Sequence, residues 1–157
     1  MKISPQDKKD LLIEALSYIQ RFRNQIIVIK YGGAAMIEEA LKTSFAQDIV
    51  LLQSLGMRPV VVHGGGPEVS KVIQSLGQKV TFVDGLRVTT AENLKVAEMV
   101  LSGNLNKEII AHLQTFGGKA VGLSGKDGNL IQADKKKLAS GIDLGYVGTI
   151  RQINPEL

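Results

Sequence analysis

Two apolar runs in the sequence end in glycine-rich turns, and these turns are where chemistry is expected. Residues 26–29 lead through Lys30 into the first turn, and residues 59–62 lead through His63 into the second. The glycines are Gly32 and Gly33 in the first turn and Gly64, Gly65 and Gly66 in the second. Glycine presents its backbone N–H without a Cβ, so that a polyanion can approach closely. The paired turns therefore indicate an anion site.

Three side chains near these turns could act on an anion. The ammonium of Lys30 could neutralise charge that develops on a transferring phosphoryl group. Arg87, in Gly-Leu-Arg-Val-Thr, carries a planar guanidinium that can hold a carboxylate through two hydrogen bonds. His63 could act as a base, but a hydrogen bond that fixes the glycine turn is the favoured interpretation. His112 falls in the middle of an expected helix and is interpreted as structural.

The common nucleotide-binding motifs are absent. A dinucleotide fingerprint starting at Gly64 would need glycine where Val69 stands. A Walker loop ending at Gly125-Lys126 would need glycine at Ala120 and a hydroxyl residue at Asp127. With no cysteine and two histidines, the sequence also lacks a thiolate site, and no metal-ligand cluster or Ser-His-Asp arrangement is evident. No protein metal site is predicted.

The elements that position these residues alternate between helix and strand. The spacing predicts helices over 8–22 (with Ser4 and Pro5 at its start), 37–55 and 67–76, and strands over 26–29 and 58–63. Continuous β-branched runs are typical of strands covered on both faces, and alternation with helices is typical of parallel sheets. The fold class is therefore α/β, with an open, mainly parallel sheet sandwiched by helices.

The pattern changes after residue 77. Residues 78–88 predict two short strands around an Asp84-Gly85 turn. Helices are expected over 90–101 and 104–116, with a break at Ser102-Gly103, followed by a third buried strand over 119–123. Residues 124–129 read as a turn-rich loop, and the tail as short antiparallel pieces.

Composition narrows the class of protein. The chain has 157 residues, 22% charged and 44% hydrophobic, with a net charge of +4. This mixture excludes a disordered polymer, a collagen repeat and a coiled coil. No run approaches the ~18 apolar residues of a membrane span, and the opening ten residues lack a secretory signal. With 4% aromatic residues and one short basic run at 135–137, neither nucleic acid nor a membrane is an expected partner. A cytoplasmic location fits best.

Four segments resemble the acetylglutamate kinases of the amino acid kinase family. They are Ile-Val-Ile-Lys-Tyr-Gly-Gly-Ala-Ala-Met (27–36), Val-Val-Val-His-Gly-Gly-Gly-Pro (60–67), Asp-Gly-Leu-Arg-Val-Thr (84–89) and Gly-Asn-Leu-Asn-Lys (103–107). Their order and spacing agree with that family over the chain from residue 26 onward. Residues 12–23 also resemble the extra N-terminal helix of its arginine-sensitive, ring-forming hexamers.

The resemblance implies an activity and a role for each matching position. The implied reaction is ATP-dependent phosphorylation of the side-chain carboxylate of N-acetyl-L-glutamate in arginine biosynthesis, with ATP and Mg²⁺ as the co-substrate. Lys30 matches a catalytic lysine that stabilises the transition state. Gly32, Gly33 and Gly65 match phosphoryl-binding glycines. Gly65, Gly66 and Arg87 match substrate-binding positions, with Arg87 on the substrate's α-carboxylate.

The resemblance also implies a domain organisation. Residues 1–24 form an N-terminal helix that is a candidate oligomerisation arm, and a homo-oligomer is expected to form through residues 8–22. Residues 25–157 correspond to the acetylglutamate-binding N-terminal lobe. The family's nucleotide-binding lobe, with its second catalytic lysine, has no counterpart in these 157 residues, so the chain by itself is expected to be inactive.

Two alternatives remain open. The chain could be a non-catalytic module that binds acetylglutamate or assembles through its first helix. It could also be another member of the amino acid kinase family, acting on aspartate, carbamate or UMP. The segment Gly-Leu-Arg-Val-Thr argues against the second alternative.

Overall fold

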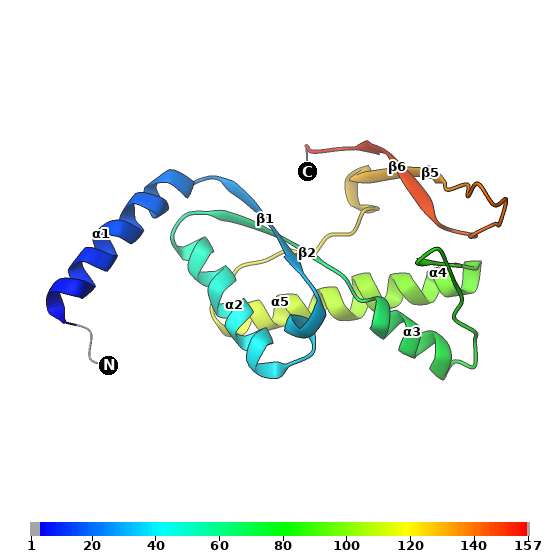
Figure 1. Ribbon diagram of the computed structural model, residues 1–157, viewed down its shortest axis with the longest axis horizontal. Helices are drawn as coiled ribbons and strands as arrows, with labels where there is room; N and C mark the ends of the chain where they lie inside the picture. Colours follow the sequence, from blue (N-terminus) through cyan, green and yellow to red (C-terminus); the bar gives the residue numbers. More distant parts are fainter. Residues whose placement is uncertain (1–3, 157) are drawn as a thin grey trace. The chain divides into compact units, whose positions relative to one another are not determined.

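The computed structural model describes residues 4–156 as an α/β chain that divides into two compact units (Figure 1). The first unit runs to His63 and includes His112–Lys119, and the second consists of Gly64–Ala111 and the chain from Ala120 onward. Residues 1–3 of the expected N-terminal segment and residue 157 of the expected lobe lie outside the described residues.

The first helix, α1 (Pro5–Phe22), confirms the helix predicted from its spacing. Ser4 caps it: its Oγ accepts the Asp7 N–H at 3.1 Å, and the Asp7 carboxylate accepts the Ser4 N–H at 3.3 Å. No residue of α1 is buried, and Leu12 is 69% exposed. Between residues 4 and 156, no helix combines the length and apolar character needed to cross a membrane.

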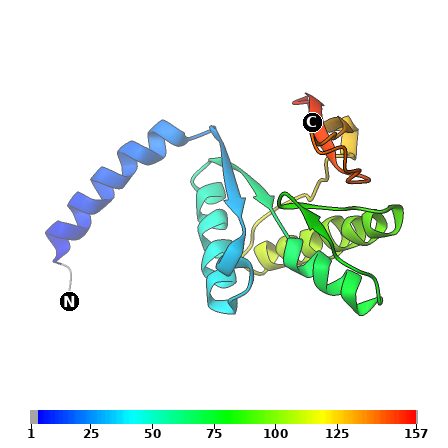
Figure 2. The ribbon, with the colours of Figure 1, turned by 45° about the vertical axis from the view of Figure 1, so that its right-hand side comes forward.

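A parallel strand pair forms the centre of the first unit. The strands β1 (Ile26–Tyr31) and β2 (Arg58–His63) are aligned from Ile26 beside Arg58 to Tyr31 beside His63. Both strands and their parallel arrangement confirm the prediction. The helix α2 (Glu39–Ser54) runs beside the pair in both ribbon views (Figures 1 and 2). The Tyr31 ring stacks on Phe45 of α2 with 3.9 Å between ring centroids, so α2 packs on the sheet face that carries Tyr31.

The opposite face of this pair is open among residues 4–156. Its apolar members, all between 46% and 68% exposed, are Ile26, Val28, Val60 and Val62. Parallel strands are normally covered on both faces. Lys30 belongs to this open face, where Val62 is its partner in the strand register.

The second unit begins with α3 (Gly66–Ser75), which is followed by a hairpin. The core side of α3 is formed by Val69 and Ile73. The hairpin strands β3 (Phe82–Val83) and β4 (Leu86–Arg87) are joined by Asp84 and Gly85, with φ of 49° and 75°. A two-residue turn with both φ angles positive matches the right-handed twist of antiparallel strands, which confirms the predicted hairpin.

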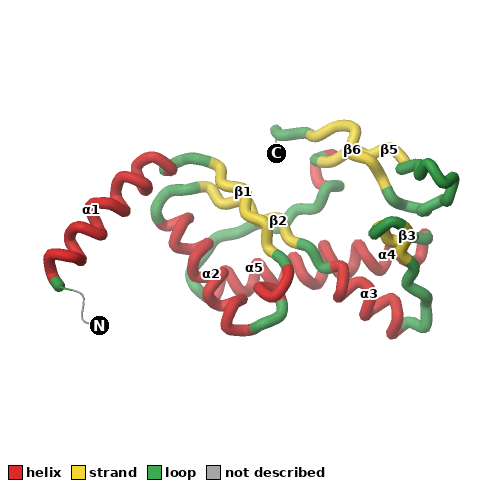
Figure 3. Tube along the Cα trace, in the orientation of Figure 1, coloured by secondary structure: helices red, strands yellow, loops and turns green. Residues whose placement is uncertain are grey.

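The expected break at Ser102-Gly103 is wrong. The helix α4 (Ala91–Glu98) continues into the π-helical segment η2 (Met99–Leu105) and on into α5 (Asn106–Thr115). Figure 3 colours the whole run as helix. The Asn106 N–H donates to the Leu101 carbonyl, five residues earlier, so the backbone accommodates the serine and glycine within a wide helical turn.

The strand predicted over 119–123 is also wrong. These residues are irregular, and Val121 is 86% exposed. A strand needs a neighbour to complete its hydrogen bonds, and no strand of residues 4–156 pairs with this segment. Beyond it, β5 (Ile131–Lys135) and β6 (Gly148–Ile153) form an antiparallel pair, as expected for the tail.

Candidate functional site

Lys30 occupies the next-to-last position of β1, just before the first glycine turn. Its side chain is exposed, whereas the neighbouring Tyr31 is buried and belongs to the opposite face. The Tyr31 hydroxyl donates to the Ala35 carbonyl at 2.8 Å. Tyr31 therefore ties the end of the strand to the following turn, while Lys30 stays accessible to an anion.

Gly32 and Gly33 form an open turn between β1 and the 3-10 helix η1 (Gly33–Met36). Gly33 has a φ of 64°, a conformation that side chains rarely allow. A Cβ built on either glycine would meet no other atom within 4 Å. The backbone of this turn therefore has free space around it, and a ligand could approach it.

The second glycine turn leads directly into α3. Gly65 is the N-cap residue of α3, is buried, and has a φ of 151° and a ψ of 22°. Its carbonyl accepts the Val69 N–H at 3.0 Å, which starts the helix. The first N–H groups of a helix have no partner within the helix and lie at the positive end of its dipole. This end of α3 is therefore suited to an anion.

Arg87 is held against this same end of α3. Its Nη2 donates to the Gly66 carbonyl at 2.9 Å and to Ser70 Oγ at 2.7 Å. The guanidinium also lies over the Phe82 ring, 4.8 Å from its centroid. The structure thus brings together Gly66 and Arg87, two of the predicted substrate-binding residues.

One nitrogen of Arg87 lacks a hydrogen-bond partner among the described residues. Nη1 is buried and makes no hydrogen bond within the part of the chain that the structure describes. Burial also lowers the pKa of the Arg87 guanidinium, although arginine remains charged at neutral pH. A buried donor without an acceptor is costly, and a carboxylate oxygen would satisfy it. The chemistry of this nitrogen therefore fits the carboxylate predicted for Arg87.

Ser70 is a site residue that was not predicted from the sequence. Its hydroxyl donates to the Gly66 carbonyl at 3.0 Å and accepts the hydrogen bond from Arg87. A serine four residues after Gly66 lies on the same face of a helix, one turn on, where its hydroxyl can reach that carbonyl. This spacing was the available signal, but serine is common enough in helices that the signal alone did not point to Arg87.

The histidines His63 and His112 lie in different surroundings. His63 ends β2, is half-buried and lies beside Tyr31 in the strand register. His112, in α5, packs edge-on against Phe116 with 5.8 Å between ring centroids. The packing of His112 fits the structural role expected for it.

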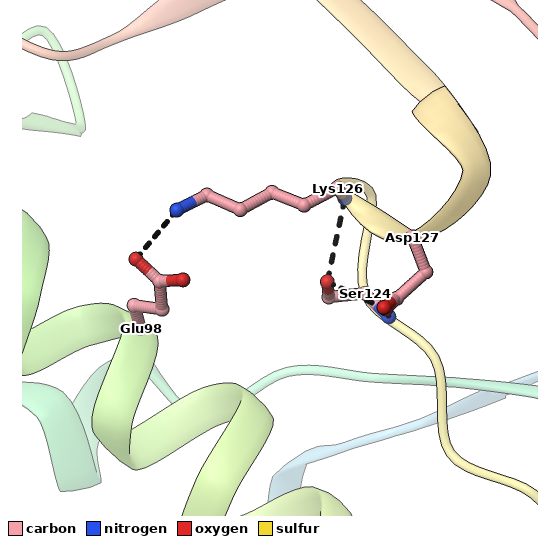
Figure 4. Close-up of polar contacts among 4 residues, drawn as sticks. All are labelled: Glu98, Ser124, Lys126 and Asp127. Carbon is pink, nitrogen blue, oxygen red and sulfur yellow. Dashed lines mark hydrogen bonds and ion pairs between the residues drawn. The ribbon is translucent and has the colours of Figure 1, made fainter.

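The loop after residue 123 also differs from a phosphate-binding loop (Figure 4). The Asp127 carboxylate accepts the backbone N–H and the hydroxyl of Ser124 at 2.6 and 2.8 Å, which lowers the pKa of Asp127. Lys126 forms an ion pair with Glu98 at 2.6 Å. The loop is therefore closed by its own carboxylate, and its lysine pairs with a glutamate of α4.

The fold defines an α/β protein in which two parallel strands, β1 and β2, are each followed by a glycine turn. The chain belongs to the amino acid kinase family, whose model matches residues 25–157. It is 49% identical to an acetylglutamate kinase of Moorella thermoacetica, over 99% of this chain and 55% of the relative. It is 54% identical to an acetylglutamate kinase of Desulfitobacterium hafniense, over 96% of this chain and 53% of the relative.

A solved structure shows the same fold. The N-acetylglutamate synthase of Neisseria gonorrhoeae, complexed with coenzyme A and N-acetyl-glutamate, matches with a TM-score of 0.72 and 29% identity. The match covers 90% of this chain and 32% of that chain. The predicted family and α/β class are therefore confirmed. The chain spans about half the length of the curated relatives it matches.

Proposed function

We propose that this chain provides the acceptor-binding part of an acetylglutamate kinase, which transfers a phosphoryl group from ATP to the side-chain carboxylate of N-acetyl-L-glutamate. The observation that carries this proposal is the identity of about half of all positions with acetylglutamate kinases, over nearly the whole chain. The bound N-acetyl-glutamate named for the synthase of the same fold is consistent with this ligand class.

Arg87 is proposed to hold the α-carboxylate of the substrate. Two hydrogen bonds from Nη2 fix the guanidinium at the end of α3, and the buried Nη1 remains for a ligand oxygen. A carboxylate at this position also meets the positive end of the helix, to which the Gly65 and Gly66 amides belong. Charge and geometry therefore favour an acidic substrate.

The catalytic residue is proposed to be Lys30, which stabilises the phosphoryl group during transfer. The phosphoryl-binding residues are proposed to be Gly32, Gly33 and Gly65. The attacking side-chain carboxylate is already ionised at neutral pH, so that the reaction needs no general base. Catalysis then depends on alignment of the reactants and on cations and N–H donors that stabilise the developing charge. The exposed ammonium of Lys30 supplies such a cation, and the glycines supply N–H donors.

ATP is proposed as the phosphoryl donor, accompanied by Mg²⁺. Within residues 4–156 no group of three or more His, Asp or Glu side chains could hold a metal ion. Mg²⁺ that accompanies ATP is held mostly by phosphate oxygens and water, so a protein cluster is not required. The residues of this chain would then contribute substrate binding and charge stabilisation rather than metal coordination.

The helix α1 is proposed to assemble the protein into a homo-oligomer. Its apolar residues, among them Leu12, Leu16 and Ile19, follow helical spacing, and none of them is buried. An apolar helix face gains stability when it packs on another apolar surface. We assign that surface to a second copy of this chain. The location proposed for the enzyme is the cytoplasm.

A titration with competing ligands tests the proposed substrate. Isothermal titration calorimetry of the chain should show binding of N-acetyl-L-glutamate and much weaker binding of L-aspartate. Preferential binding of aspartate would move the chain to another branch of the family, and no binding of N-acetyl-L-glutamate would refute the proposal.

A further inference from the structure

The π-helical segment η2 packs against α3 at the point where α3 begins. A Cβ built on Gly65 would overlap Leu105 Cδ1 and would lie 2.7 Å from Leu101 Cδ2. Leu105 is only 8% exposed. Gly65 is therefore enclosed by two leucine side chains from η2, whereas a Cβ on the neighbouring Gly64 or Gly66 would meet nothing within 4 Å.

The conformation of Gly65 needs such support. Its φ of 151° lies where side chains are rarely tolerated, and glycine loses more backbone freedom on ordering than any other residue. Gly65 nevertheless must be ordered, because its carbonyl accepts the Val69 N–H that opens α3. Packing from one side by Leu101 and Leu105 restricts the alternative backbone conformations of this residue.

The two leucines reach Gly65 from a helix segment of unusual geometry. They are four residues apart, so their side chains lie on one face of the helix. Between them the backbone takes a wide turn that contains Ser102 and Gly103 and is closed by the Asn106 N–H to the Leu101 carbonyl. Such turns are rare in proteins as a whole, and those that occur are often found at functional sites.

We propose that Leu101 and Leu105 are positioning residues for the acceptor site, and that they act by holding the Gly65 backbone in its ligand-binding conformation. This inference rests on the proposed function, in which the Gly65 amide binds the anion. The leucines make no contact with ligand in this mechanism. A displaced Gly65 would present its N–H in the wrong direction, and misplacement by about 1 Å can cost on the order of 100-fold in activity.

The test compares Leu105→Ala with Leu105→Met in the full chain. One readout needs no ligand: amide hydrogen exchange at Val69, whose N–H is bonded to the Gly65 carbonyl. The other readout is the dissociation constant for N-acetyl-L-glutamate. We expect Leu105→Ala to accelerate Val69 exchange and to weaken binding by about tenfold, the effect of losing one hydrogen bond to the ligand. Leu105→Met keeps most of the side-chain volume and should restore both.

Leu113→Ala is the matched control. Leu113 is a leucine of α5 with 6% exposure, and its truncation should lower stability without changing Val69 exchange or ligand affinity beyond that general effect. If Leu105→Ala does not fold, as judged by circular dichroism, Leu101→Ala replaces it, because Leu101 is only half-buried.

The outcomes separate the two proposals. Unchanged Val69 exchange in a folded Leu101 or Leu105 variant overturns the positioning role. Equal effects of Leu113→Ala on Val69 exchange and on affinity also overturn it. If the parent chain does not bind N-acetyl-L-glutamate while Leu105→Ala still accelerates Val69 exchange, the proposed function fails and the leucines only support the fold.

Discussion

Replacing Arg87 with alanine should remove most of the affinity for N-acetyl-L-glutamate. In the structure, both hydrogens of Nη2 are bonded to the Gly66 carbonyl and Ser70 Oγ, while the buried Nη1 has no hydrogen-bond partner among residues 4–156. The ligand carboxylate would accept a charge-assisted hydrogen bond from Nη1, which the two bonds of Nη2 hold in place. The loss of such a contact costs roughly 1.5–3 kcal/mol, which corresponds to a dissociation constant about 10- to 150-fold higher.

Arg87→Lys refines the same prediction. Lysine keeps the positive charge but lacks the planar fork, so it cannot bond Gly66 and Ser70 and also reach a ligand in the same geometry. We expect an affinity between those of the parent and Arg87→Ala. If charge alone determined binding, the lysine variant would match the parent.

Isothermal titration calorimetry of the parent and both variants measures this effect. Arg151→Ala serves as the control, because Arg151 is an exposed arginine of β6 that bonds Gln132 rather than any predicted site residue. Its dissociation constant should equal that of the parent. Circular dichroism establishes that each variant is folded. Equal affinities for the parent and a folded Arg87→Ala variant would refute the role assigned to the guanidinium.

Three further predictions concern other parts of the chain. In the full-length protein, Lys30→Ala should lower kcat by on the order of 10²–10³. The assay traps acetylglutamyl phosphate as its hydroxamate, and a near-normal kcat would exclude a catalytic role for Lys30. Deletion of residues 1–24 should reduce the number of chains per particle, as calculated from the mass measured by light scattering. An unchanged number of chains with intact folding would argue against assembly through α1. NMR titration should give Asp127 a pKa below its ordinary value, because the folded state bonds its carboxylate to Ser124. The contribution of Asp127 to stability is then present above the unfolded-state pKa and lost as the pH falls through the lowered one. Ser124→Ala should raise this pKa only part of the way, because the backbone N–H of residue 124 still donates to the carboxylate.

The local elements could be predicted because short-range physics determines them. The helix α1 follows from its apolar spacing and the Ser4-Pro5 start, and the structure shows the cap in place. The hairpin follows from Asp84-Gly85, since few residue pairs accept two positive φ angles. In both cases the deciding interactions lie within a few residues of one another.

The elements that were missed depend on distant contacts. Ser102-Gly103 favours a break by local propensity, yet the helix continues because η2 packs against α3. Residues 119–123 have the composition of a buried strand, but a strand also needs a partner, and composition does not supply one. Ser70 was missed for a related reason: its partner Arg87 is 17 residues away in the sequence.

The candidate site was anticipated in part. The glycine turns and the type of side chain at position 87 pointed to an anion, and the structure brings Gly66 and Arg87 together. The contact of Leu101 and Leu105 with Gly65 could not be predicted from the sequence. No periodicity connects a glycine turn to a helix face about 40 residues later.

An NMR titration of the ¹⁵N-labelled chain with N-acetyl-L-glutamate tests the central claim most directly. The claim is that an acidic acceptor binds at the start of α3, against Arg87. Saturable shifts of the Gly65 and Gly66 amide resonances and of the Arg87 side-chain resonances are the predicted result. Absence of saturable shifts there, or shifts confined to other segments, would contradict the claim.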